Sequence, residues 1–130
     1  MKSLTLKTSA LAIFTGIIFT ACSQNANFKT VKPAEFQKLI NDKNTILVDV
    51  RTPEEYSEGK IVNAINIDYT SGNFEKEAIK LDKSKTILVY CHSGRRSAGA
   101  ANILSQKGYK VINLEGGIIN WTAQGLPINK

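Results

Sequence analysis

Two uninterrupted apolar runs constrain the fold of this chain more than any other feature of its sequence. Residues 46–50 read Ile-Leu-Val-Asp-Val and residues 86–90 read Thr-Ile-Leu-Val-Tyr, so neither run alternates between apolar and polar positions. Runs of this kind, rich in β-branched residues, are typical of strands covered on both faces, as in a parallel sheet. Residues 28–31, 64–67 and 110–113 are shorter candidate strands, the first of them at an edge of the sheet.

Helical patterns alternate with these strands. Residues 52–55, Thr-Pro-Glu-Glu, form a capping box, in which Thr caps the helix, Pro takes its first position and the last Glu reaches back to the cap. Apolar residues at helical spacing, or a terminating glycine, mark four further helices at residues 33–41, 73–81, 97–107 and 118–124. The alternation predicts an α/β domain with a central parallel sheet and helices on both faces.

The N-terminal part of the chain has a different character. Lys2 and Lys7 precede about ten apolar residues at 10–19, and no charged residue occurs between Lys7 and Lys29. The apolar stretch is too short to span a bilayer, which takes ~20 residues. A charged start, a short apolar middle and small residues after it indicate a secretory signal peptide over residues 1–21.

The end of that stretch, Phe19-Thr20-Ala21-Cys22, resembles the lipobox of bacterial lipoproteins, although Phe19 stands where the box usually has Leu. The resemblance implies cleavage before Cys22, its lipidation, a polar tether at residues 22–27 and a domain at residues 28–130. Two or more acyl chains give stable membrane anchoring. We therefore expect a lipid-anchored protein of the bacterial cell envelope that faces the periplasm. Ser23, in place of the Asp that signals inner-membrane retention, favours the outer membrane. The alternatives are an ordinary signal peptide or an N-terminal anchor.

Charge and size narrow the function of the remaining chain. Without residues 1–21 it has 109 residues, enough for one domain with its own core, and 15 basic against 11 acidic side chains give a net charge of +4. This mild positive charge favours small anionic molecules. The absence of a Lys/Arg run or of interleaved aromatic residues argues against nucleic acid as a partner.

The segment after the second apolar run carries the candidate chemistry. Cys91 follows a predicted buried strand, and a helix is expected to start near Ser97. Open α/β sheets bind ligands at the carboxyl ends of their strands, and the helix N-terminus there would stabilise a thiolate. Gly94 allows successive loop N–H groups to converge on an anion. The pattern predicts a nucleophilic cysteine in an anion-binding loop. The alternative is a small buried cysteine that only packs.

Three ordered segments resemble the single-domain rhodaneses, the thiosulfate sulfurtransferase family. Residues 91–97 resemble its active-site loop, Cys-x-x-Gly-x-Arg, and residues 48–56 resemble its N-terminal signature. Residues 114–118, Trp121 and residues 125–128 resemble its C-terminal signature. One stretch departs from the pattern, because the family usually has Gly-His-Ile-Pro-Gly-Ala where this chain reads Gly59-Lys60-Ile61-Val62-Asn63-Ala64. The departure predicts an altered turn there.

The resemblance implies a two-step sulfur transfer with Cys91 as the catalytic residue. The thiolate would attack the outer sulfur of a donor such as thiosulfate, giving a persulfide and sulfite, and cyanide or a thiol would then accept the sulfur. No cofactor and no metal are expected. Arg95 and Arg96 would attract the anionic donor, unless Arg96 instead braces the loop. A catalytic role for His92 is disfavoured. The substrate-binding loop is assigned to five residues: His92, Ser93, Gly94, Arg95 and Arg96.

Other readings of the site differ in loop length or in acceptor. Phosphatases that use Cys-x5-Arg would require Arg at position 97, which is Ser97, whereas Arg96 comes one residue too early. A non-catalytic rhodanese-like binding module and a periplasmic persulfide carrier to a protein partner stay open, although an intact Cys91 favours activity. Away from the loop, two pairs of residues are assigned structural roles. Asp49 and Arg51 are expected to fasten neighbouring backbone, and Tyr56 and Trp121 to pack in the core or at its rim.

Overall fold

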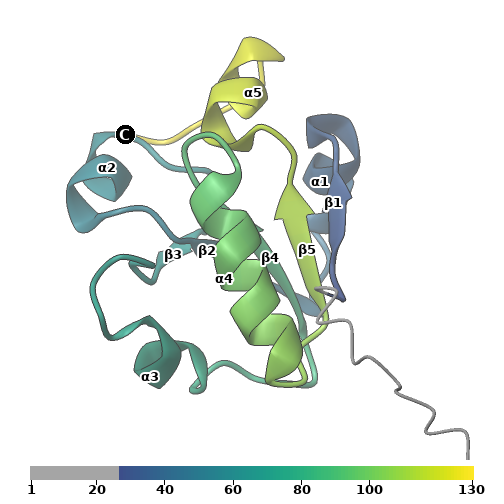
Figure 1. Cartoon of the computed structure of the whole chain (residues 1–130). Coiled ribbons are helices and arrows are strands. Elements are labelled where there is room, and N and C mark those ends of the chain that lie inside the picture. The colour runs from purple at the N-terminus through teal and green to yellow at the C-terminus, as the bar shows by residue number, and fades with distance from the viewer. Residues whose placement is uncertain (1–26) are drawn as a thin grey trace, which may run out of the picture.

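Residues 27–130 are described by the structure, a computed structural model in which helices lie against a central sheet (Figure 1). The predicted signal peptide and Cys22 lie outside these residues. Within residues 27–130, no helix is long and apolar enough to cross a membrane. The elements in chain order are β1 (Lys29–Val31), α1 (Pro33–Leu39), β2 (Thr45–Asp49), α2 (Pro53–Glu58), β3 (Ile65–Asn66), α3 (Phe74–Ala78), β4 (Thr86–Tyr90), α4 (Arg95–Gln106), β5 (Val111–Leu114) and α5 (Gly117–Ala123).

The five strands form one parallel sheet in the order β1-β5-β4-β2-β3. The two apolar runs of the sequence became β2 and β4, which pair with each other in the middle of the sheet. Residues 87–90 are completely buried, which explains why the run that forms β4 has no polar alternation. The predicted parallel sheet and the edge position of β1 are confirmed.

Helices cover both faces of the sheet, as predicted, and each face has its own core. On one face, Phe36 of α1 and Trp121 of α5 pack edge to face with ring centroids 6.3 Å apart, over Leu88 and Tyr90 of β4. On the other face, α3 and α4 pack against the alternate residues of the same strands. That second core contains Phe74, Ala78, Ala100, Ala101 and Leu104 from the helices, and Val48, Val50, Ile87, Val89 and Cys91 from the strands and their ends.

The start of α4 corrects one prediction. The helix begins at Arg95, two residues earlier than expected, because Gly94 takes a left-handed conformation (φ 100°) and acts as the N-cap. Arg95 and Arg96 therefore belong to the first helical turn and not to the loop. The expected helix at residues 73–81 is shorter, because after α3 the N–H groups of Lys80 and Leu81 bond three residues back, to Glu77 and Ala78.

The departure at residues 59–64 keeps a turn. Ala64 N–H donates to the carbonyl of Ile61 at 3.1 Å, and Asn63 has a positive φ of 67°. Asn tolerates the left-handed region better than other non-glycine residues, so it replaces the glycine of the usual pattern.

Candidate active site

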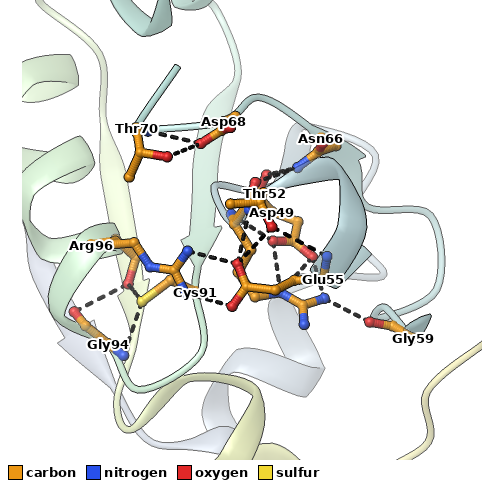
Figure 2. Close-up of polar contacts among 12 residues, drawn as sticks. Asp49, Thr52, Glu55, Gly59, Asn66, Asp68, Thr70, Cys91, Gly94 and Arg96 are labelled. Carbon is orange, nitrogen blue, oxygen red and sulfur yellow. Dashed lines mark hydrogen bonds and ion pairs between the residues drawn. The ribbon is translucent and has the colours of Figure 1, made fainter. Parts of the chain in front are cut away.

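Cys91 lies at the carboxyl edge of the sheet, directly after the central strand β4. Its side chain is enclosed by the loop that leads into α4, and the residue is 1% exposed. Figure 2 shows the sulfur inside this loop, with Gly94 on one side and Arg96 on the other. The strand end and the following loop are where the sequence predicted them.

Two groups donate hydrogen bonds to the Cys91 sulfur. The backbone N–H of Gly94 lies 3.0 Å from Sγ, and the hydroxyl of the buried Ser97 lies 3.3 Å from it. The Ser97 hydroxyl is also 3.2 Å from the Gly94 carbonyl oxygen, so its single proton can serve either acceptor. A charged sulfur would attract that proton more strongly. Sequence reasoning treated Ser97 only as a helix start, yet it is one helical turn from the loop and faces back into it.

The backbone of the loop is held by the N-terminus of α5. Ile118 N–H donates to the carbonyl of Cys91 at 2.9 Å, and Ile119 N–H donates to that of His92 at 3.2 Å. Gly117 has a positive φ of 62°, and a Cβ there would lie 2.6 Å from the Cys91 carbonyl oxygen and nearer still to that of His92. Gly117 is thus a site residue that sequence reasoning placed only in a signature. The signal that could have found it is the Gly-Gly pair one residue after the end of a strand.

Arg96 is engaged by Glu55 of α2. Two bonds of 2.8 Å join its guanidinium to the two carboxylate oxygens (Figure 2). The same carboxylate accepts the N–H of Thr52 at 3.0 Å, which completes the predicted capping box. These bonds, above all that from Arg96, lower the pKa of Glu55 to about 2. Arg96 therefore ties the first turn of α4 to the first turn of α2.

Arg95 differs from its neighbour. Its side chain is exposed, and within residues 27–130 it makes no ion pair. His92 and Ser93 are also exposed at the loop surface. Of the two arginines predicted to attract an anion, Arg95 is the one whose charge is not matched by a carboxylate.

Asp49 and Arg51 form a buried ion pair of 2.6 Å beneath α2. Arg51 also donates to the carbonyl of Gly59 at 2.6 Å, so the pair fastens backbone as expected. Trp121 and Tyr56 take the structural roles expected of them. The Trp121 indole is buried and donates to the carbonyl of Pro127, and the Tyr56 hydroxyl donates to that of Ala64.

An open cleft of about 350 Å³ lies beside the loop, between α2 and α5. The charges of two of its residues, Arg51 and Glu55, are already paired with Asp49 and Arg96. Among residues 27–130 there is no group of three or more His, Cys, Asp or Glu that could hold a metal ion. The cleft is lined by Arg51, Glu55, Glu58, Gly59, His92, Ile118, Ile119, Thr122 and Ile128.

Comparison with known proteins gives consistent matches. A family model described as the rhodanese-like domain matches residues 32–124. The chain is 40% identical over 93 residues to a sulfurtransferase of Allochromatium vinosum, a match that covers 71% of this chain and 85% of that one. It is 33% identical over 120 residues to the thiosulfate:glutathione sulfurtransferase of Saccharomyces cerevisiae, covering 79% and 86% of the two chains.

Two further matches show how the domain occurs elsewhere. The tRNA uridine(34) hydroxylase of Pelagibacter ubique is 39% identical over 101 residues, which are 76% of this chain but only 34% of that protein. Among solved structures, a rhodanese-related protein from Thermoplasma volcanium superposes with a TM-score of 0.71 at 33% identity, covering 78% of this chain and 98% of that one.

Replacing Gly117 with Ala should displace the Cys91 loop. The added methyl group would overlap the carbonyl oxygens of Cys91 and His92, so we expect sulfur-transfer activity to fall at least about tenfold. Gly125→Ala is the matched control, because Gly125 also has a positive φ (76°) but no atom lies within 4 Å of an added Cβ. That variant should lose about 1 kcal/mol of stability and keep its activity. Equal activity losses in the two variants would contradict the role of Gly117.

Replacing Glu55 with Gln should destabilise the domain in a pH-dependent way. The folded-state pKa of Glu55, about 2, is below its ordinary value of 4.5, so its ion pair stabilises the fold fully above pH 4.5. The stabilisation is lost as the pH falls from 4.5 towards 2. We expect a difference in unfolding free energy of about 1 kcal/mol at pH 7, measured by urea denaturation, that shrinks below pH 4.5. Glu54→Gln is the control, because Glu54 is exposed and makes no ion pair within residues 27–130. A pH-independent difference for Glu55→Gln would refute the assignment.

Proposed function

Because the chain belongs to the rhodanese family, we propose that it is a sulfurtransferase that carries a sulfane sulfur as a persulfide on Cys91. The observation that carries this proposal is the Cys91 sulfur at the carboxyl end of β4, where Gly94 N–H and the Ser97 hydroxyl donate to it. An inert packing cysteine would need neither donor. The curated relatives named as sulfurtransferases support the same reaction class.

The reaction proceeds in two displacement steps. In the first, the Cys91 thiolate attacks the outer sulfur of thiosulfate, the sulfur–sulfur bond of the donor breaks, and sulfite leaves with the electron pair. In the second, an acceptor nucleophile attacks the outer sulfur of the persulfide and the Cys91 thiolate leaves. With cyanide as acceptor the product is thiocyanate. Neither step needs an external oxidant or reductant.

The residues around Cys91 have two proposed roles: some stabilise negative charge on the sulfur, and others bind the donor. Gly94 N–H and the Ser97 hydroxyl would stabilise negative charge on the sulfur as it attacks the donor and again as the persulfide is cleaved. Arg95, whose charge is unmatched, would attract the anionic donor. Arg96 acts indirectly, since its guanidinium is taken by Glu55 and holds the loop in place. The exposed His92 and Ser93 would contribute backbone and rim to the donor site.

The acceptor is proposed to be a thiol, in line with the glutathione in the name of the yeast relative, or cyanide. A second candidate function is persulfide delivery to a protein partner, which the open cleft beside the loop would admit. In that case small thiols would accept sulfur slowly and a partner protein would accept it fast. A purely regulatory module is disfavoured by the intact, hydrogen-bonded Cys91.

We further propose that the protein is anchored in the bacterial cell envelope by acylation of Cys22 and faces the periplasm. The support is the sequence alone: Lys2 and Lys7, the apolar residues 10–19 and the lipobox-like ending at Cys22. Metabolic labelling with a palmitate analogue should mark the wild-type chain, and Cys22→Ala should remove the label.

The role of Cys91 can be tested directly on residues 27–130, in which it is the only cysteine. This domain should convert thiosulfate and cyanide to thiocyanate, and intact-mass spectrometry after thiosulfate treatment should show one added sulfur atom. Cys91→Ser should abolish both, because serine keeps the shape but cannot form the persulfide. The absence of adduct and of turnover with every sulfane donor tried would favour the binding-module alternative.

Replacing Arg95 should separate donor binding from catalysis. With Arg95→Ala we expect the KM for thiosulfate to rise about tenfold, because one unpaired charge near a dianion contributes on the order of 1 kcal/mol. Transfer from the preformed persulfide to 2-mercaptoethanol should be much less affected, because the attacking thiolate carries one negative charge whereas thiosulfate carries two. Arg95→Lys should largely restore the KM, and added salt should raise it in the wild type. An unchanged thiosulfate dependence in Arg95→Ala would show that this arginine does not attract the donor.

A further inference from the structure

Lysines gather at the edge of the sheet opposite Cys91. One stands at the beginning of each of four neighbouring strands: Lys29 opens β1, Lys110 and Lys85 directly precede β5 and β4, and Lys43 comes two residues before β2. By the strand register, all four lie within two residues of the level of Lys110. With strands ~4.8 Å apart, they form a row about 15 Å wide, which we call the lysine row.

The lysine row carries an excess of positive charge, because in the described part of the chain its four lysines stand beside only two carboxylates, those of Asp42 and Asp82. Within residues 27–130 none of its four members makes an ion pair, and three of the four are exposed, Lys85 being half-buried. Asp42 and Asp82 lie in the same loops and accept N–H bonds from Asn44 and Ser84 of their own turns. The Asp82 carboxylate also interacts with the charge of Lys85, so the two carboxylates offset part of the row's charge but not all of it. Lysines at helix C-termini offset the helix dipole, whereas the start of a strand has no comparable dipole. The row therefore has no evident structural role.

The chain enters the domain beside this row. Asn27 and Phe28 line a hollow of about 410 Å³ together with Lys29, Tyr109 and Lys110. Cys22 lies five residues before Asn27 in the sequence. Five residues span at most about 18 Å when fully extended. A lipid on Cys22 would thus keep the lysine row close to the membrane surface.

The opposite edge has a different charge balance. Arg51 and Arg96 are paired with carboxylates there, and Arg95 is accompanied by exposed acidic residues on the surrounding elements. These acidic residues are Glu54 and Glu58 of α2 and Glu115 after β5. Lys32, Lys60 and Lys130 also lie at this edge, so its unpaired basic and acidic side chains nearly balance, four against three. An anionic surface would therefore attract the row, with four lysines against two aspartates, more strongly than the catalytic edge.

We propose that the lysine row binds the anionic head groups of phospholipids and orients the domain with the Cys91 edge away from the membrane. The proposal builds on the proposed anchoring through Cys22, but the row and its position are independent of acylation. Figure 1 shows the geometry, with β1 beginning at the lower right of the molecule and α5, which holds the Cys91 loop, at the top. Donor and acceptor would then approach Cys91 from the aqueous side.

The binding test uses residues 27–130 without any lipid. This part contains both hydrophobic cores. The match to this chain covers 98% of the solved rhodanese-related structure, which therefore consists of little more than the same domain. We therefore expect residues 27–130 to fold on their own. This domain should co-sediment with vesicles of equal parts phosphatidylglycerol and phosphatidylcholine at low ionic strength, and not with phosphatidylcholine alone. Neutralising three lysines of the row in K29Q/K85Q/K110Q should weaken binding on the order of 100-fold, since each surface lysine contributes about fivefold.

The matched control removes the same charge elsewhere. K32Q/K60Q/K130Q lowers the net charge equally but changes lysines away from the row, and it should bind nearly as the wild type does. Equal losses of vesicle binding in the two variants would show that net charge alone governs binding, and would contradict a specific role for the lysine row. Binding to duplex DNA of matched charge without binding to vesicles would also overturn it, in favour of nucleic acid. If Cys22 is labelled by palmitate but the domain does not bind vesicles, the proposed lipid binding by the lysine row is refuted, whereas the proposed lipid anchor at Cys22 is supported.

Orientation can be read from tryptophan fluorescence. The chain has one tryptophan, Trp121, which is buried and therefore gives a constant background in both of two variants. Phe28→Trp places a second tryptophan beside the row, and Ile119→Trp places one at an exposed position of α5, at the opposite end of the molecule (Figure 1). In vesicles that contain brominated phosphatidylglycerol, the added fluorescence of Phe28→Trp should be quenched and that of Ile119→Trp should not. Quenching in Ile119→Trp would contradict the proposed orientation.

Discussion

The Cys91 loop depends on two backbone carbonyls that have no partner within the loop itself. The carbonyls of Cys91 and His92 accept hydrogen bonds from the N–H groups of Ile118 and Ile119. The N-terminus of α5 therefore supplies the hydrogen-bond donors that these two carbonyls do not find in β4 or α4. Both carbonyls can come this close because Gly117 has no side chain. With the carbonyls turned towards α5, the N–H of Gly94 is free to point at the sulfur. The strand, the loop and α5 thus form one unit, although about 25 residues separate Cys91 from Gly117 in the sequence.

The three arginines near the site differ in how far they are buried, and the most deeply buried ones are paired with carboxylates. Arg51 is 5% exposed and is neutralised by Asp49, because an unpaired buried guanidinium would be costly. Arg96 is half-buried and shares Glu55 with the cap of α2, which makes it a link between two helix starts. Arg95 alone remains at the surface without a counter-ion within residues 27–130. A basic pair in the sequence therefore has one structural member and one that can meet a substrate.

Much of this architecture follows from local patterns. The strand β4 could be predicted because it is buried on both faces and its sequence is therefore apolar throughout. The capping box at Thr52 could be predicted because its hydrogen bonds join residues only three apart. What could not be read from local patterns depends on contacts between distant segments. The Glu55–Arg96 pair spans 41 residues, and Gly117 meets Cys91 only because β5 lies beside β4. The start of α4 was misplaced for a different reason: whether Gly94 is a loop residue or a left-handed cap depends on a backbone angle that its identity permits but does not impose.

The direction of the chain links the two edges of the molecule. In a parallel sheet every strand begins at one edge and ends at the other, so a site formed after a strand always lies opposite the strand beginnings. Here β1 is the first element of the described domain, and the residues that precede it enter at the edge where the lysine row lies. An anchor placed before β1 is therefore as far from Cys91 as the sheet allows. An anchor at the C-terminus, which follows α5 near the catalytic edge, would instead lie on the same side as the site (Figure 1). The proposed N-terminal attachment is in this sense compatible with a nucleophile that follows a parallel strand.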